Sequence, residues 1–160
     1  KDLISVGIGE VQVTRSQTAI LSCIGLGSCV AVCVYDRTAK IGGIAHVVLP
    51  QHDGREEHSK AKYADTAIPL LLDEITKLGG SKSQMVVKIA GGAHVLIAPG
   101  LQNAFKTGER NLAEVKAALE RAGLRVSAAE VGGNKGRTLR MAIDTGKITV
   151  RITGGEDAEL

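Results

Sequence analysis

The sequence has few aromatic residues, no tryptophan and little excess of either charge. Its three aromatic residues do not form the row of rings on which nucleic-acid bases stack. A formal net charge of +3 gives no reason to expect a nucleic-acid partner either. No apolar run approaches the roughly 20 residues of a membrane-spanning helix, and the first residues lack the apolar stretch of a secretory signal. We therefore expect a cytoplasmic protein that neither binds nucleic acid nor inserts into a membrane.

Cysteine is also scarce, and the three cysteines are not spaced as metal ligands. In a cytoplasmic protein they are expected to be thiols rather than disulfides. Five residues separate Cys23 from Cys29, whereas zinc sites normally place paired ligands two to four residues apart. Cys29 and Cys33 share one predicted strand, where a separation of four residues spans about 13 Å. No metal is predicted, but a site in which Cys23, Cys29 and one histidine converge stays open as an alternative.

Glycine, by contrast, is abundant: the chain has 20 in 160 residues, against a usual frequency of ~7%. Many occur as pairs between apolar runs, a placement that predicts tight turns and sharp strand exits. A chain of this length buries roughly 70% of its unfolded surface, so it needs neither disulfides nor a structural metal to fold. Because we find no repeat, linker or second core, residues 1–160 are expected to form one domain.

The hydrophobic pattern predicts an α+β fold with more strand than helix. Runs of β-branched and apolar residues predict strands at 3–13, 18–23, 29–35, 41–49, 85–90, 124–131, 139–144 and 147–152. Helical spacing predicts helices at 64–78 and 109–122. In the first helix Pro69 is a conflict: it either kinks the helix or marks its first turn, with Asp65 or Thr66 as cap. Residues 51–62 are almost entirely polar and predict an exposed loop.

Cys29 differs from the other two cysteines because it follows the glycine turn Gly25-Leu26-Gly27-Ser28 at the start of a strand. Glycines there let the backbone bend sharply and leave the first strand residue open to a substrate. Successive N–H groups in such a turn can also bind an anion. A thiol beside an oxyanion site is the arrangement that acyl transfer needs. The plainer alternative is a structural cysteine, since free cysteines are among the most buried residues.

His46 is the candidate partner of Cys29. A hairpin turn centred between Arg37 and Thr38 would place His46 directly opposite Cys29, with Cβ atoms about 5 Å apart. A loop with an even number of residues keeps the pair on one face of the sheet, and an odd number separates them. A neighbouring imidazole can take the thiol proton and stabilise the reactive thiolate. The alternative is a core histidine bonded to a backbone carbonyl.

The remaining histidines and glycine loops give weaker predictions. His52 and His58 lie in the polar loop and are expected on a solvated surface. His94 follows a glycine pair and could line a pocket, but it has no obvious partner. The loop 132–137 has a phosphate-binding composition but lacks the Lys-Ser/Thr ending of a P-loop. It is interpreted as a tight corner between strands and is expected to form one wall of the site.

Several motifs together resemble the CheD family of chemoreceptor glutamine deamidases. The first two are Gly25-Leu26-Gly27-Ser28-Cys29-Val30-Ala31-Val32 and Ala45-His46-Val47-Val48-Leu49-Pro50. The others are Lys62-Tyr63-Ala64-Asp65-Thr66-Ala67, Lys88-Ile89-Ala90-Gly91-Gly92-Ala93, Gly108-Glu109-Arg110-Asn111 and Gly132-Gly133-Asn134-Lys135-Gly136-Arg137. The resemblance covers nearly the whole chain, and the combination is specific although each glycine motif alone is not.

The resemblance implies a fold of packed β-sheets with flanking helices, similar to the deamidase domain of cytotoxic necrotizing factor toxins. It implies a papain-like use of Cys29 as nucleophile and His46 as general base and acid, without metal or organic cofactor. The N–H groups of Cys29 and of the turn at Gly27 and Ser28 would hold the oxyanion. The expected activity is deamidation of selected glutamines on the cytoplasmic helices of methyl-accepting chemotaxis receptors. Some members also bind the phosphatase CheC, which the resemblance implies as a further partner.

One position departs from the family pattern. The third catalytic position, six residues before the nucleophile, is typically Thr and here is Cys23. A thiol is a weaker hydrogen-bond partner than a hydroxyl. Either Cys23 orients the histidine poorly, or Ser22 or a backbone carbonyl replaces it. A weakly active or non-catalytic regulatory module that binds CheC or receptor helices is therefore an alternative, as is a redox or metal site using Cys23 and Cys29.

Overall fold

The computed structural model describes residues 2–94 and 102–160, with side chains described from residue 106 onward in the second range. The strands are Asp2–Ser5 (β1), Val11–Thr14 (β2), Ala19–Leu26 (β3), Val30–Asp36 (β4), Ile41–Val47 (β5), Met85–Gly91 (β6), Val126–Val131 (β7), Arg137–Ala142 (β8), Ile148–Ile152 (β9) and Asp157–Glu159 (β10). The α-helices are Ala64–Lys77 (α1) and Gln102–Arg121 (α2), and Lys60–Lys62 (η1) and Lys82–Gln84 (η2) are short 3₁₀ helices.

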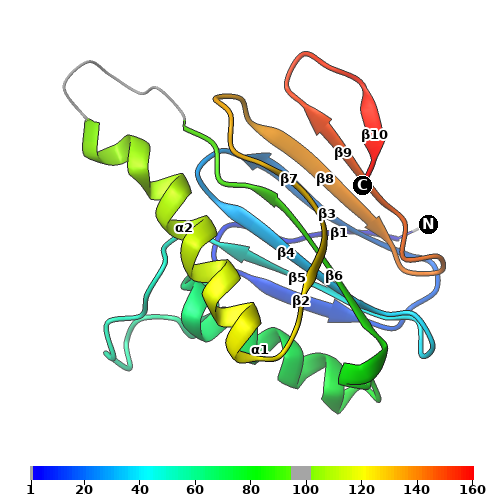
Figure 1. The fold of residues 1–160 in the computed structure, drawn as a ribbon. Coiled ribbons are helices and arrows are strands. Elements are labelled where there is room, and N and C mark those ends of the chain that lie inside the picture. Colours follow the sequence, from blue (N-terminus) through cyan, green and yellow to red (C-terminus); the bar gives the residue numbers. More distant parts are fainter. Residues whose placement is uncertain (1, 95–101) are drawn as a thin grey trace.

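The strands form two five-stranded sheets, and both helices lie on one side of them (Figure 1). Sheet A has the order β1-β3-β8-β9-β10, and sheet B has the order β2-β5-β4-β6-β7. The helices cover the outer face of sheet B, and sheet A packs on its inner face. The expected α+β fold of packed sheets with flanking helices is confirmed. Among the described residues, no helix combines the length and apolar character needed to cross a bilayer.

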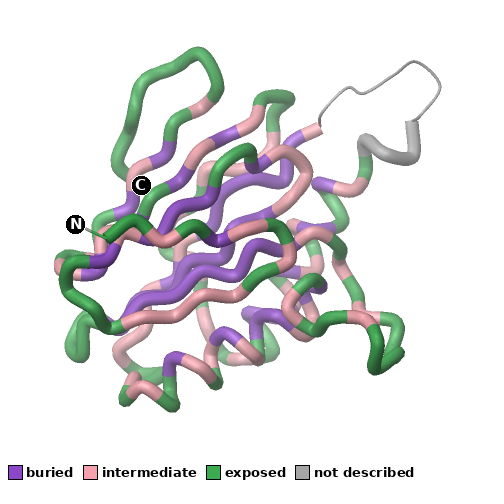
Figure 2. Tube along the Cα trace, turned by 180° about the vertical axis from the view of Figure 1, so that it is seen from behind, coloured by how far each residue is buried: buried purple, intermediate pink, exposed green. Residues whose placement is uncertain are grey.

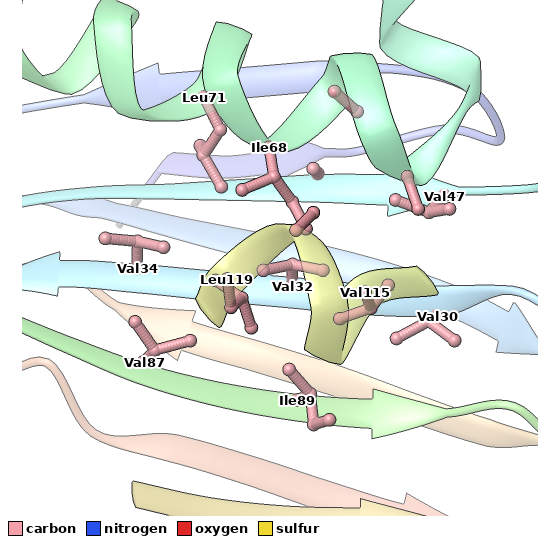
Figure 3. Packing of buried hydrophobic residues seen from close by; sticks show 14 of the residues in the cluster. Val30, Val32, Val34, Val47, Ile68, Leu71, Val87, Ile89, Val115 and Leu119 are labelled. Carbon is pink, nitrogen blue, oxygen red and sulfur yellow. The ribbon is translucent and has the colours of Figure 1, made fainter. Parts of the chain in front are cut away.

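The outer face of sheet B buries its side chains against the two helices. Alternate residues of β4, namely Val30, Val32 and Val34, point to this layer, as period-two alternation requires. Figure 3 shows them beneath Ile68 and Leu71 of α1 and Val115 and Leu119 of α2, which are further members of this core.

The other face of sheet B forms a second core against sheet A. Ala31 and Cys33 of β4 lie in this inter-sheet core with Leu21, Cys23 and Leu26 of β3. Buried residues are concentrated in the central strands of both sheets, and exposed residues lie mainly in the connections (Figure 2). Because every residue of β4 and β5 is buried, both faces of this hairpin are covered.

The β4–β5 hairpin has a different register from the one expected. Asp36 pairs with Ile41, so the turn contains four residues and is centred between Thr38 and Ala39. His46 is therefore opposite Ala31, two positions from the expected partner. The prediction that His46 lies directly opposite Cys29 is wrong. Because the loop length is even, both residues still belong to the inter-sheet face.

Two other differences concern segments whose structure depends on distant partners. The expected strand 3–13 is two strands of different sheets: β1 pairs with β3, and β2 pairs with β5. The break falls at Gly7-Ile8-Gly9, where Gly9 has a φ of 73°. In α1 neither Asp65 nor Thr66 is the cap: the N-cap is Tyr63, and Pro69 lies inside the helix.

Candidate functional site

Cys29 lies at the junction between the glycine turn and β4, and other segments hold that junction through its carbonyl groups. The Gly27 carbonyl accepts from Ala93 N–H at 2.9 Å, and the Cys29 carbonyl accepts from Gly92 N–H at 2.8 Å. Gly91 has a φ of 111°, and a Cβ there would overlap the Cys29 carbonyl oxygen. The end of β6 therefore needs glycine in order to approach this turn so closely.

Three carbonyls of the turn are bonded, but the corresponding N–H groups are not. In the part of the chain that the structure describes, the N–H groups of Gly27, Ser28 and Cys29 have no hydrogen-bond acceptor in other residues. The thiol of Cys29 is half-buried, and its own N–H is close enough to the sulfur to favour the thiolate. Consecutive donors beside a nucleophile are what an oxyanion site requires.

Asn111 of α2 connects the turn to the end of β5. Its buried Nδ2 donates to the Ser28 carbonyl at 3.0 Å and to the Val48 carbonyl at 2.9 Å. One side chain thus fixes the residue before Cys29 and the second residue after His46. The sequence offered a signal for Asn111, because it is the polar residue on the apolar face of a predicted helix, four residues before Val115.

His46 is buried, and its imidazole is bonded to a backbone group from another segment. Its Nδ1 lies 3.0 Å from the carbonyl oxygen of Val6, between β1 and β2. Its Nε2 is buried without a hydrogen-bond partner among the described residues. The thiol of Cys29 is therefore not hydrogen-bonded to His46 in this structure.

The pairing still brings Cys29 and His46 near each other. Extending the register by one residue places Cys29 opposite Val48, so His46 is its diagonal neighbour on the same face. Diagonal neighbours in an antiparallel pair lie about 7–8 Å apart, within reach of long side chains. Catalytic hydrogen bonds are often long or poorly aligned before substrate binds.

Burial shifts the pKa values of both groups so that the thiol keeps its proton. Desolvation raises the pKa of Cys29 above its ordinary 9.0, an effect partly offset by its own N–H. Desolvation also lowers the pKa of His46 below its ordinary 6.5, partly offset by the bond to Val6 and the charge of Glu10. At neutral pH the resting pair is a thiol and a neutral imidazole. This state differs from the stabilised thiolate that the sequence suggested.

The other two cysteines are buried in the inter-sheet core. Burial, and then the charge of Cys29, raises the pKa of Cys23 to about 12, so this thiol is neutral. Neither Cys23 nor Ser22 is hydrogen-bonded to His46, whose Nδ1 is bonded to the Val6 carbonyl. Ser22 projects from β3 on the opposite face to Cys23, away from the inter-sheet core.

The remaining candidates lie around the site or away from it. His94, which had no partner in the sequence analysis, has its Nε2 3.0 Å from a Glu109 carboxylate oxygen. His52 and His58 bond within their own loop. No group of three or more potential metal-ligating side chains occurs among the residues described.

The loop 132–136 is a corner between β7 and β8. It contacts the segment that holds Cys29, since Gly132 N–H donates to Gly91 and Gly133 accepts from His94. The interpretation of this loop as a tight corner between strands is confirmed.

A hollow of about 440 Å³ lies elsewhere, between the two helices. Its lining includes Pro69, Leu72 and Ala118 but no cysteine or histidine. It is on the helical side of sheet B, whereas Cys29 and His46 belong to the inter-sheet side. Cys29 and His46 are therefore separate from this hollow.

Comparison with known proteins gives one consistent result. The family model described as "CheD chemotactic sensory transduction" matches residues 48–152, a range that begins just after His46. A protein of Desulfitobacterium hafniense named "Probable chemoreceptor glutamine deamidase CheD" is 42% identical over 97% of both chains. A protein of the same name from Desulforamulus reducens is 44% identical over 94% of this chain and 91% of its own.

A relative from Thermotoga maritima, named "Chemoreceptor glutamine deamidase CheD", is 41% identical over 97% of this chain and 96% of its own. Among solved structures, Neisseria meningitidis protein NMB0706 aligns with 83% of this chain and 63% of its own, at 12% identity and a TM-score of 0.48.

Proposed function

Because the chain belongs to the CheD family, we propose that it is a cysteine-dependent protein-glutamine deamidase acting on chemotaxis receptors. The substrates are selected glutamines on the cytoplasmic helices of methyl-accepting receptors, and the products are glutamate side chains and ammonia. The observation that carries this proposal is the half-buried Cys29 thiol, set beside unbonded N–H groups on the sheet face that also bears His46. The names of the relatives support the same activity.

The first step forms a bond between Cys29 Sγ and the amide carbon of the glutamine. Because the resting pair is neutral, the thiol proton moves to Nε2 of His46 as the sulfur attacks. Nε2 is available for this proton because it has no other partner among the described residues. The electron pair of the carbonyl moves to oxygen, which becomes the oxyanion.

The N–H groups of Gly27, Ser28 and Cys29 are the proposed donors to that oxyanion. Removing one donor from such a site typically costs ~3 kcal/mol of transition-state stabilisation. The bonds that hold the turn go to its carbonyls, so the N–H groups stay available without rearrangement. Pre-set donors are more effective than donors that must reorganise during the reaction.

The second step breaks the carbon–nitrogen bond and leaves a thioester. His46 returns its proton to the departing amine, which leaves as ammonia. A water molecule, deprotonated by His46, then attacks the thioester carbon, and Cys29 leaves with the proton restored to sulfur. The scheme uses no metal and no organic cofactor. Cys23 is left out of it because it has no hydrogen bond to His46.

Residues 1–160 are proposed to act as one CheD-like deamidase domain in the cytoplasm, where the receptor helices lie. A phosphatase of the CheC kind is a further proposed partner. A second candidate function is a weakly active or non-catalytic module that binds CheC or receptor helices. The observation that favours it is the lack of a hydrogen bond between Cys29 and His46 in the free protein.

Ammonia release from purified receptor cytoplasmic helices tests the proposal. Wild type and Cys33→Ala are expected to release ammonia, and mass spectrometry of the receptor helices is expected to show glutamine converted to glutamate. Cys33→Ala is the matched control because it removes a thiol from β4, the strand that Cys29 directly precedes. Cys29→Ala is expected to release none. Equal release by Cys29→Ala and wild type would exclude the mechanism, and undiminished chemotaxis in a Cys29→Ala strain would favour the non-catalytic module.

A further inference from the structure

We propose that the main-chain carbonyl of Val6, and not a side chain at position 23, orients His46 and fixes its tautomer. This inference rests on the proposed function and names a positioning group for it. The Val6 oxygen lies 3.0 Å from Nδ1 of His46. A carbonyl can only accept, so Nδ1 carries the hydrogen and Nε2 of the neutral ring carries a lone pair. That tautomer is the one in which Nε2 can take a proton from a thiol.

The segment 6–10 holds both the ring and the backbone of His46. Val6 is buried, and its N–H donates to the Ser22 carbonyl at 2.7 Å, which extends the pairing of β1 with β3. Gly9 N–H donates to the His46 carbonyl, and His46 N–H donates to the Glu10 carbonyl, each at 2.9 Å. The Val6 carbonyl is thus a rigid acceptor, fixed to the strand that contains the histidine.

A side chain at position 23 has weaker grounds for this role. Cys23 is a buried neutral thiol without a hydrogen bond to the ring, and sulfur is a weak acceptor. The Nδ1 hydrogen is a single donor, and Val6 already accepts it. A hydroxyl introduced at position 23 could therefore not accept the Nδ1 hydrogen, because that hydrogen is already donated to the Val6 carbonyl. The departure from threonine at this position is consequently compatible with full activity.

The tautomer is measured on the full chain by nitrogen–proton correlation spectra of the His46 ring, at a mildly alkaline pH where the ring is neutral. The signals are assigned by their loss in His46→Asn. We expect hydrogen on Nδ1 in wild type, in Cys23→Ala and in Cys23→Thr. Hydrogen on Nε2 in wild type would overturn the inference. This readout does not depend on catalysis, so it decides the role of Val6 even if the ammonia assay excludes deamidation.

The activity arm compares three variants. Cys23→Ala and Cys23→Thr are expected to deamidate within about twofold of Cys33→Ala, which corrects for the loss of a buried thiol. In a serine protease, a wrong histidine tautomer costs about 10⁴-fold. If Cys23 were the orienting group, Cys23→Ala would fall on the order of 10²-fold or more below Cys33→Ala. That loss, or a gain on the order of tenfold in Cys23→Thr, would overturn the inference.

Discussion

At the scale of single residues, the Cys29 thiol is accessible but not acidic. Its pKa is raised by burial above the ordinary 9.0, and iodoacetamide reacts only with the thiolate. We predict that Cys29 is alkylated more slowly at neutral pH than a cysteine in an unstructured peptide, with a rate that still rises above pH 9. Mass spectrometry of the labelled protein identifies the modified residue.

The other two thiols serve as internal controls for that experiment. Cys23, with a pKa of about 12, and Cys33 are buried and are expected to react only after unfolding in denaturant. A Cys29 labelling rate that reaches its plateau well below pH 9 would contradict the prediction. It would show a thiolate–imidazolium pair at rest instead of the neutral pair.

The buried imidazole of His46 gives the free energy of unfolding a dependence on pH. Its folded pKa lies below 6.5, so at pH values just under 6.5 the unfolded chain binds a proton that the native chain does not. The free energy of unfolding therefore falls as the pH falls below 6.5, by at most about 1.4 kcal/mol per pH unit for one group. We predict a shallower fall in His46→Asn, which keeps a side-chain donor but cannot titrate.

Urea unfolding at a series of pH values measures this difference. Carboxylates contribute the same acid dependence to both proteins, so subtracting the two curves isolates the histidine. Parallel curves would mean that His46 titrates alike in the folded and unfolded chains, which its burial argues against.

At the scale of elements, Asn111 couples α2 to both parts of the site. Asn111→Ala leaves the partly buried carbonyls of Ser28 and Val48 without their donors. An unsatisfied buried polar group costs about 1–3 kcal/mol, so we predict a loss of roughly 2–4 kcal/mol in the free energy of unfolding. Deamidation is expected to fall more than the folded fraction does, because the turn before Cys29 loses its anchor.

Lys116→Ala is the matched control, since this exposed side chain lies on the same helix. Urea denaturation and ammonia release are measured on both variants. If Asn111→Ala were as stable and as active as Lys116→Ala, the two hydrogen bonds donated by Asn111 would have no role in stabilising the fold or positioning the site.

The elements that sequence reasoning predicted are those with a strong local pattern. The apolar run of β4 and the helical spacing of α1 gave these elements nearly at their observed bounds. The hairpin parity was also predictable, because an even loop is enough to put Cys29 and His46 on one face. The exact pairing was not, since it depends on whether the turn has two or four residues.

Other parts of the structure have no local signal in the sequence. β10 contains Asp157, Ala158 and Glu159, and it is a strand because it pairs with β9, where Arg151 binds the Asp157 carboxylate at 3.0 Å. The acceptor for His46 is a backbone carbonyl, a group that every residue possesses. Only the tertiary fold distinguishes Val6 from its neighbours, so the residue that contacts the imidazole was not predictable.

At the scale of the whole molecule, two hydrophobic cores lie on opposite faces of sheet B, and only one of them borders the candidate site. The helix–sheet core contains Leu71 of α1, and the inter-sheet core contains Leu26, which directly precedes the turn to Cys29. Both leucines are fully buried, so Leu71→Ala and Leu26→Ala should each lower the free energy of unfolding by about 2–5 kcal/mol. Only the cavity created by Leu26→Ala lies in the layer of Cys29 and His46.

We therefore predict that Leu26→Ala changes the rate and pH dependence of Cys29 alkylation, while Leu71→Ala leaves both as in wild type. The physical reason is that the Leu26 cavity loosens the packing against which the thiol is desolvated, whereas the sheet itself separates Leu71 from it. Alkylation in native buffer and urea unfolding are compared for the same preparations. An equal change in both variants would mean that the sheet transmits packing defects from the helical layer to the site.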